Sequence, residues 1–183
     1  MFRSLLVVLG LGVAGLLPLA LADDKADETA VRAVAQRYFA AYAKKDLDGF
    51  MALWSEKSPD FKSRKQTMQR IFGETEDIRL KALTIVKATV TDEAAQLRVR
   101  VELASTDKRS GKPHADMGRL NRLLDLVRED GAWKVRRYGP AELLLLDRLL
   151  AADGKAGREK LYQDEKDLVA LQLVIEACRL CNT

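Results

Sequence analysis

The chain has 183 residues, of which 48% are hydrophobic and 32% are charged. That length suits one domain with a small appendage. The formal net charge of +4 is too small to indicate nucleic-acid binding, so we expect no nucleic-acid partner.

The first 22 residues have the pattern of a secretory signal peptide. Arg3 supplies a positive start, residues 5–19 form an apolar run broken by glycines and a proline, and residues 20–22 offer an A-x-A cleavage site. The run is shorter than the roughly 20 residues that a membrane span needs. We therefore expect export from a bacterial cytoplasm, to the periplasm or beyond, after cleavage near Ala22. An uncleaved membrane anchor is the alternative.

The segment that follows predicts three helices. Residues 31–44 place apolar side chains on one helical face, and Asp27 or Thr29 can cap its start. A second helix is expected after Asp46, which suits an N-cap better than a general base. A third is expected over residues 58–73, begun by a capping serine with a proline in the first turn and ended by a glycine.

After residue 76 the hydrophobic period changes from about 3.6 to 2, which predicts strands. Residues 97–103 alternate apolar and charged side chains, as a half-buried strand does. Residues 78–90 form a strand that is bent or bulged, because its apolar parity shifts between Ile85 and Val86. Strands over residues 120–128 and 133–138 are joined by the turn signal Asp-Gly.

The C-terminal part predicts helices. One begins at Pro140 and continues to about residue 150. Its expected inner stripe is Leu143, Leu146, Leu149 and Leu150. Further helical pieces are expected over residues 158–162 and 167–180. Cys178 and Cys181 lie one helical turn apart, and a local disulfide, pairing with a partner and a redox couple are the alternatives, of which we favour the first.

This order of elements resembles the NTF2-like, or SnoaL-like, cone-fold family. The resemblance rests on YFAAYAKKDLDGFMALWSE, SPDFKSRKQTMQRIF and LDLVREDGAWKVRRYGPAE, and it covers about residues 27–150. It implies an α+β fold in which three N-terminal helices pack on a curved antiparallel sheet and leave a conical pocket. Members include isomerases, dehydratases, hydrolases and non-catalytic binding domains, so the fold does not assign an activity.

We expect the NTF2-like domain to span residues 23–152 and a helical extension to span residues 153–183. The sequence AADGKAGREKLYQDEKDLVALQLVIEACRL is similar to the linker that precedes tetratricopeptide repeats in bacterial CHAT-domain proteins. That second resemblance implies a stand-alone or truncated form of the N-terminal module of such a protein.

Enzymes of this fold place a tyrosine, aspartate or histidine in the cone and shift its pKa by burial. The candidates here are Tyr38, Tyr42 and Asp125. The two tyrosines lie four residues apart on the inner helix face, where a core role is the favoured interpretation. Asp125 faces solvent if Leu124 faces the core, and it enters the cone if the strand has the opposite parity. We favour the first. The expected pocket residues are Tyr38, Tyr42, Trp54, Phe72 and Arg122, and an inward Arg122 would hold an anion.

The sequence indicates no metal site and no cofactor. His114 is the single histidine and is expected to be exposed in a polar loop, without partners for a metal site or a catalytic triad. The polar sides of the strands are rich in cations, so a basic outer sheet face is expected. Its members would be Arg98, Arg100, Lys134 and Arg136.

We therefore expect an exported binding or protein-interaction module and favour a non-enzyme. The ligand would be small and apolar or anionic. A protein partner would dock on the C-terminal helices or the basic sheet face, and a homodimer would form through the open sheet. The rival is an isomerase or hydrolase that uses a Tyr/Asp pair in the cone. The direction of the Asp125 side chain separates the two functions.

Overall fold

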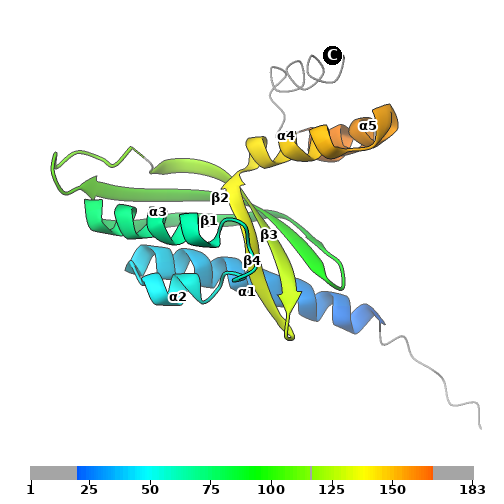
Figure 1. Ribbon diagram of the computed structural model, residues 1–183, viewed down its shortest axis with the longest axis horizontal. Helices are drawn as coiled ribbons and strands as arrows, with labels where there is room; N and C mark the ends of the chain where they lie inside the picture. The colour runs from blue at the N-terminus through cyan, green and yellow to red at the C-terminus, as the bar shows by residue number, and fades with distance from the viewer. Residues whose placement is uncertain (1–19, 116, 167–183) are drawn as a thin grey trace, which may run out of the picture.

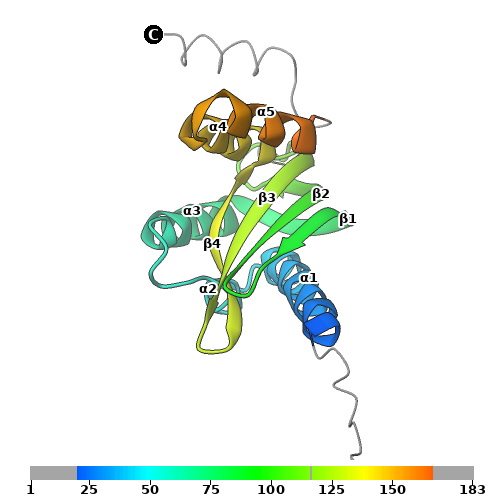
Figure 2. The same ribbon diagram turned by 90° about the vertical axis from the view of Figure 1, so that its right-hand side faces the viewer.

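The computed structural model describes residues 20–115 and 117–166. The elements are α1 (Ala20–Lys44), α2 (Leu47–Met51), α3 (Phe61–Glu74), β1 (Thr75–Val90), β2 (Ala94–Asp107), β3 (Gly118–Glu129), β4 (Ala132–Pro140), α4 (Ala141–Ala151) and α5 (Gly154–Glu165). The strands form one antiparallel sheet in the order β1-β2-β3-β4. Helices α1, α2 and α3 lie on one side of this sheet, and α4 and α5 lie on the other (Figures 1 and 2). The predicted α+β architecture is confirmed.

The main core lies between the sheet and the first three helices. The alternation predicted for residues 97–103 is confirmed, because Leu97, Val99 and Val101 are each at most 1% exposed. They belong to the same buried cluster as Val31 and Phe39 of α1. Full burial of one such side chain contributes about 1.5–3 kcal/mol. The inner sheet face is therefore the face that holds the domain together.

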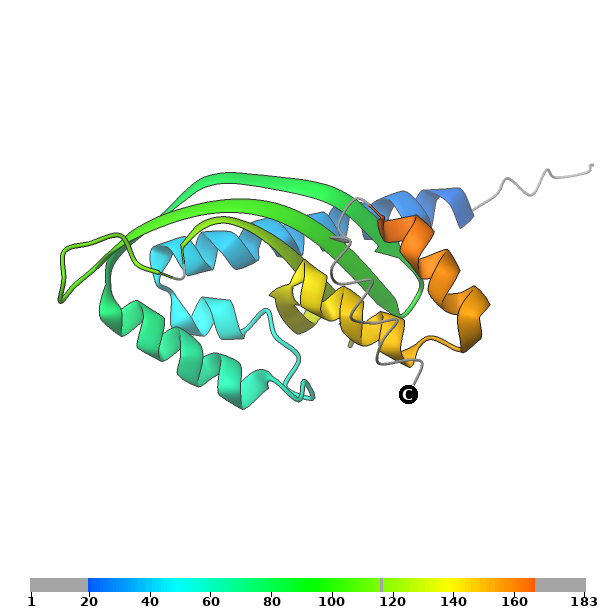
Figure 3. The ribbon, with the colours of Figure 1, turned by 90° about the horizontal axis from the view of Figure 1, so that it is seen from above.

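Irregular pairing bends the sheet. The β1–β2 register shifts between Leu80 and Ala82 and again between Ile85 and Lys87. The second shift confirms the parity change predicted there. Bulges of this kind bend the strand that carries them, and the long strands are bowed along their length (Figure 3). The β3–β4 turn also follows its prediction, since Asp130 and Gly131 both have positive φ, as a type I′ hairpin requires.

The start of α1 differs from the prediction. The helix begins at Ala20, so Asp27 and Thr29 lie inside it and neither caps it. The Asp27 carboxylate accepts hydrogen bonds from Arg128 Nη1 at 2.9 Å and from Trp133 Nε1 at 3.3 Å. Asp27 therefore joins α1 to the β3–β4 hairpin, a tertiary contact that the local sequence did not reveal.

The break between α1 and α2 follows the prediction. Lys45 adopts positive φ, and Asp46 Oδ1 accepts a hydrogen bond from the Gly49 amide at 2.9 Å. A Cβ at Gly49 would lie 2.1 Å from Asp46 Oδ2, so a glycine leaves room for this cap. Asp46 is thus an N-cap, the role favoured over catalysis.

The N-cap of α3 was predicted two residues too early, at Ser58 instead of Asp60. The helix begins at Phe61, and Ser58 Oγ accepts a hydrogen bond from the Asp60 amide while donating to the carbonyl of Arg136. Ser58 therefore ties the preceding loop to β4. The other end was misplaced by one residue, because Gly73 lies inside the helix.

The buried stripe of α4 was predicted correctly only at Leu149. Ala141, Leu144, Leu145 and Leu149 are buried, whereas Leu143 is 56% exposed and Leu150 is 44% exposed. Ala141 and Leu144 pack on Leu123, which faces the outer side of the sheet. The prediction assumed one inner face and did not anticipate that α4 crosses to the opposite side.

Helix α5 is held on the outer sheet face by a buried ion cluster. Glu165 contacts Arg98 Nη1 at 3.0 Å and Lys87 Nζ at 2.8 Å. The helical piece predicted over residues 158–162 lies within α5. The piece predicted over residues 167–180, with Cys178 and Cys181, lies outside the described residues. Within the described part, no helix is long and apolar enough to cross a membrane.

Candidate functional site

A cavity of about 440 Å³ opens on the inner side of the sheet, between α3 and strands β2, β3 and β4. We call it the cone cavity. Its lining residues are Tyr42, Arg64, Thr67, Met68, Arg70, Ile71, Leu103, Ala115, Leu120, Arg122 and Tyr138. Two of the five predicted pocket residues, Tyr42 and Arg122, are among them. Arg122 reaches the cavity because it shares the inward parity of Leu124.

The other three predicted pocket residues lie in the core around the cavity. Tyr38 is 1% exposed, Trp54 is 2% exposed and Phe72 is 8% exposed. The Tyr38 ring centroid lies 4.5 Å from that of Phe50 and 5.0 Å from that of Tyr138. These contacts are typical of aromatic core packing. Tyr38 therefore has the core role that the sequence favoured.

Arg64 of α3 is held in one orientation at the wall of the cone cavity. Its guanidinium carbon lies 5.4 Å from the Trp54 ring centroid and 5.1 Å from the Tyr138 ring centroid. Its Nη2 donates a hydrogen bond of 2.8 Å to the Tyr138 carbonyl. Cation–π contacts and this hydrogen bond position the charge, and no carboxylate of residues 20–115 and 117–166 forms an ion pair with it.

The positive charge of this cavity affects two tyrosines, Tyr38, which is buried, and Tyr138, which is half-buried. Burial raises the pKa of the Tyr38 hydroxyl well above its usual value, and the charges of Arg64 and Arg122 oppose that rise. Burial also raises the pKa of Tyr138, and Arg122 opposes it through its charge and a hydrogen bond. Both hydroxyls are therefore neutral at physiological pH and can donate hydrogen bonds.

We expect the free energy of unfolding to decrease as the pH rises above about 10. An unfolded tyrosine ionises there, whereas the folded pKa values of Tyr38 and Tyr138 are higher. Their contribution is fully present below the unfolded pKa and is lost as the pH rises through the folded values. Urea denaturation at about pH 8 and about pH 11 measures the change. Tyr38→Phe should flatten the decrease, and Tyr162→Phe in α5 serves as a control. An equal slope for Tyr38→Phe and wild type would contradict the prediction.

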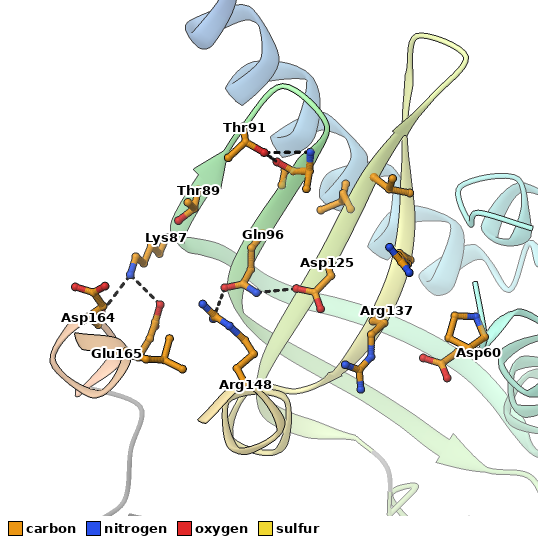
Figure 4. Close-up of a pocket in the computed structure, with 17 residues that line it drawn as sticks. Asp60, Lys87, Thr89, Thr91, Gln96, Asp125, Arg137, Arg148, Asp164 and Glu165 are labelled. Carbon is orange, nitrogen blue, oxygen red and sulfur yellow. Dashed lines mark hydrogen bonds and ion pairs between the residues drawn. The ribbon is translucent and has the colours of Figure 1, made fainter. Parts of the chain in front are cut away.

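Asp125 lies on the outer face of the sheet, away from the cone cavity. Its neighbours Leu124 and Leu126 face the core, at 0% and 2% exposed, so Asp125 takes the outward parity that we favoured. Its Oδ1 accepts a hydrogen bond of 2.7 Å from Gln96 Nε2, and Gln96 Oε1 accepts one from Arg148 of α4 (Figure 4). The sheet separates Asp125 from Tyr42, so the proposed catalytic pair is not brought together.

The surroundings of Asp125 form a second hollow of about 720 Å³, which we call the outer groove. Its lining includes the four acidic residues Asp60, Asp125, Asp164 and Glu165 and the four basic residues Lys87, Arg136, Arg137 and Arg148. These equal numbers leave the groove without a dominant charge. Its polar floor lies between α5 on one side and the loop before α3 on the other (Figure 4).

The expected basic outer face is only partly formed. Arg98 is 7% exposed and is paired with Glu165, so it does not belong to a solvated cationic surface. Lys134 turns to the edge of the sheet and donates to the Ala52 carbonyl at 2.7 Å. Arg100 and Arg136 are exposed.

His114 is buried, which corrects the expected exposed loop position. It is 8% exposed, its amide donates to the Ser105 carbonyl at 3.0 Å, and its Nε2 lies 3.8 Å from Glu74 Oε2. The loop folds back on β2 through a bridge between Thr106 and Pro113, which turns the imidazole inward. Over residues 20–115 and 117–166, no group of three His, Cys, Asp or Glu side chains could hold a metal ion.

Sequence reasoning missed Arg64 and Tyr138 as cavity residues. For Arg64 a signal existed, because it lies four residues before Met68 and seven before Ile71, on the face of α3 predicted to be buried. Tyr138 is displaced to the inner face by an irregularity in the β3–β4 register between Asp125 and Leu126. A strict alternation from Trp133 would have turned it outward.

The architecture and its cone cavity are those of the NTF2-like fold. A ketosteroid isomerase-like protein from Erwinia carotovora atroseptica SCRI1043 is similar with a TM-score of 0.52 at 18% identity, over 61% of this chain and 92% of that chain. A conserved protein from Planctomyces limnophilus DSM 3776 is similar with a TM-score of 0.53 at 18% identity, over 62% of this chain and 94% of that chain. An NTF2-like protein of unknown function from Pseudomonas putida KT2440 is similar with a TM-score of 0.51 at 15% identity, over 62% of this chain and 84% of that chain. At these identities the similarity shows the fold alone.

The family is shown by sequence. The profile described as "Anti-sigma-I factor RsgI9, C-terminal domain" matches residues 33–139, which is more than half of the chain. The chain therefore belongs to this family. No curated protein matches the chain.

Proposed function

We propose that the protein is a non-catalytic binding module that holds a small molecule in the cone cavity. The observation that carries the proposal is the composition of the lining. The described lining residues include arginines, tyrosines and apolar side chains, but no aspartate, glutamate or histidine. Proton abstraction by a positioned base needs such a group within hydrogen-bond reach, whereas binding needs an apolar hollow with a few polar groups that orient the ligand.

The rival enzyme loses support from the position of Asp125. An isomerase or hydrolase with a Tyr/Asp pair needs the carboxylate beside Tyr38 or Tyr42, and Asp125 is engaged with Gln96 on the other face. The family is also named after an anti-sigma-I factor and not after an enzyme, which agrees with binding. Export, predicted from the first 22 residues, is part of the proposal.

Two related fluorescent probes test whether the cone cavity binds ligands. Phenylnaphthylamine is a neutral aromatic molecule, and anilinonaphthalenesulfonate adds a sulfonate to the same rings. We expect saturable binding of at least one probe by the full chain. Leu120→Trp should weaken it about tenfold or more, because the indole fills the cavity. Val86→Trp adds the same ring at an exposed position of β1 and should leave the affinity unchanged.

The proposal would be wrong if neither probe bound saturably or if Leu120→Trp bound as well as wild type. Conversion of a ketosteroid or an ester by the wild type, lost in Tyr42→Phe, would overturn its non-catalytic part.

A protein-interaction role is the second candidate, and one observation favours it. Leu143 and Leu150 of α4 are 56% and 44% exposed, on the helix face opposite the one that packs on the sheet. Exposed leucines along a helix are a common element of contact surfaces. The C-terminal helices therefore suit a protein partner or a second copy of the chain better than the partly neutralised outer sheet face does.

A further inference from the structure

The cone cavity carries positive charge that the described part of the chain does not neutralise. Of its three arginines, Arg70 pairs with Glu74 at 2.8 Å on the exposed side of α3. Arg64 donates to the Tyr138 carbonyl at 2.8 Å, and Arg122 donates to the Asn121 carbonyl at 3.1 Å. These acceptors carry no net charge. Two half-buried guanidinium groups thus face one cavity without a carboxylate from the described residues.

A half-buried cation without an anion is costly, because burial removes water that the protein does not replace with opposite charge. The two charges also act over a distance, since both lower the pKa values of Tyr38 and Tyr138 against the effect of burial. An anion in the cavity would be stabilised by this positive potential. Its oxygen atoms could accept hydrogen bonds from the planar guanidinium groups.

The donors are also preorganised. Arg64 is fixed between the Trp54 and Tyr138 rings, and its buried Nε has no hydrogen-bond partner in the described structure. The Trp54 Nε1 is likewise buried without a partner. Buried donors without acceptors are rare in folded proteins. Arg64 lines the cavity and Trp54 packs behind it, so the guanidinium is held in place before a ligand enters.

The rest of the lining excludes a purely ionic ligand. Met68, Ile71, Leu103 and Leu120 form an apolar wall, and Tyr42 adds an aromatic one. A small inorganic anion would leave that wall without contacts, whereas a flat hydrocarbon body would bury it. The cavity of about 440 Å³ has the size of a small-molecule site.

We infer that the cone cavity binds an organic anion, with a carboxylate or sulfonate head directed at Arg122 and Arg64 and an aromatic or alicyclic body against the apolar wall. This inference rests on the proposed function and names its ligand class. Proton transfer is not involved, and the hydroxyl of Tyr138, which lines the cavity, stays neutral because its pKa is raised.

The probe pair described above separates this inference from the proposed function. The full chain should bind anilinonaphthalenesulfonate about tenfold or more tightly than phenylnaphthylamine, because the probes differ only in the sulfonate. Arg122→Met should remove most of this preference, because it weakens binding of the sulfonate probe far more than binding of phenylnaphthylamine. Arg122→Lys, which keeps the charge and loses the planar fork, should retain part of it.

The matched control is Arg119→Met on the same strand, since that side chain is 83% exposed and points to Glu102 on the outer face. It should bind both probes as wild type does. Added salt should weaken the binding of anilinonaphthalenesulfonate and not that of phenylnaphthylamine. This measurement uses the wild type and does not depend on how variants fold.

Equal affinities of the wild type for the two probes would overturn the organic-anion inference and leave the proposed function standing. The organic-anion inference would also be overturned if Arg122→Met kept the preference for the sulfonate probe while its circular dichroism matched that of the wild type. Absence of saturable binding for both probes would overturn both proposals.

Discussion

Replacing Glu165 by glutamine is expected to detach α5 from the sheet and to lower the hydrogen-exchange protection of its amides roughly a hundredfold. The Glu165 carboxylate lies between Lys87 and Arg98, and the side chains of Glu165 and Arg98 are each 8% exposed. Removing one partner of a buried ion pair costs about 3–5 kcal/mol, because the other charge stays in a poorly solvated place. Detachment of α5 relieves that cost by returning water to Arg98, so local opening is expected before global unfolding.

The control for Glu165→Gln lies in the same helix. Glu159→Gln makes the same change at an exposed position whose side chain contacts Gln163, and it should leave exchange unchanged. The double variant Arg98→Met/Glu165→Leu should restore docking, because apolar pairs of similar volume often replace buried ion pairs without loss. Wild-type protection of α5 in Glu165→Gln would show that other contacts hold the helix.

The ion cluster that holds α5 also shows what the sequence could not reveal. Arg98 alternates with Leu97 and Val99, and this local pattern indicated an exposed cation. It is buried in an ion pair with Glu165, which lies 67 residues further along the chain. The strand was predicted correctly from its period, whereas the environment of its polar side depends on a distant helix that the period does not encode.

The sequence predicted correctly those features that neighbouring residues alone determine. The Asp46 cap and the Asp130-Gly131 turn need only neighbouring residues, and both form as predicted. The role of Asp27 and most of the buried stripe of α4 were missed, because Asp27 and Leu144 have their partners on distant strands. Element types were therefore more predictable than their ends and buried faces.

The candidate site was predicted in part for the same reason. Arg122 was predicted as a pocket residue because the inward parity of β3 was assigned from Leu124 and Leu126. Tyr138 was missed because the irregular β3–β4 register reverses the alternation after Val135. A one-residue shift in a strand moves side chains to the other face, and nothing in the composition of β4 marks where the shift occurs.

Replacing Trp54 by alanine is expected to lower the free energy of unfolding by about 3–5 kcal/mol. That is a large fraction of the roughly 5–15 kcal/mol available to a domain. Trp54 is 2% exposed and its ring centroid lies 6.4 Å from those of both Tyr38 and Phe50. Its removal leaves a cavity and withdraws one of the two rings that hold Arg64. Urea denaturation monitored by circular dichroism measures the loss.

The phenylalanine variants of the two tryptophans separate packing from hydrogen bonding. The Trp54 Nε1 has no hydrogen-bond partner in the described structure, so Trp54→Phe loses only part of the ring and should cost roughly 1–2 kcal/mol. Trp133 is 6% exposed, and its Nε1 donates to Asp27 at 3.3 Å. Trp133→Phe removes that donor as well as part of the ring, so it should cost more than Trp54→Phe. If Trp54→Phe were as costly as Trp54→Ala, the indole nitrogen and not the aromatic packing would carry the stability of this position. An acceptor for that nitrogen would then have to be present in the free protein.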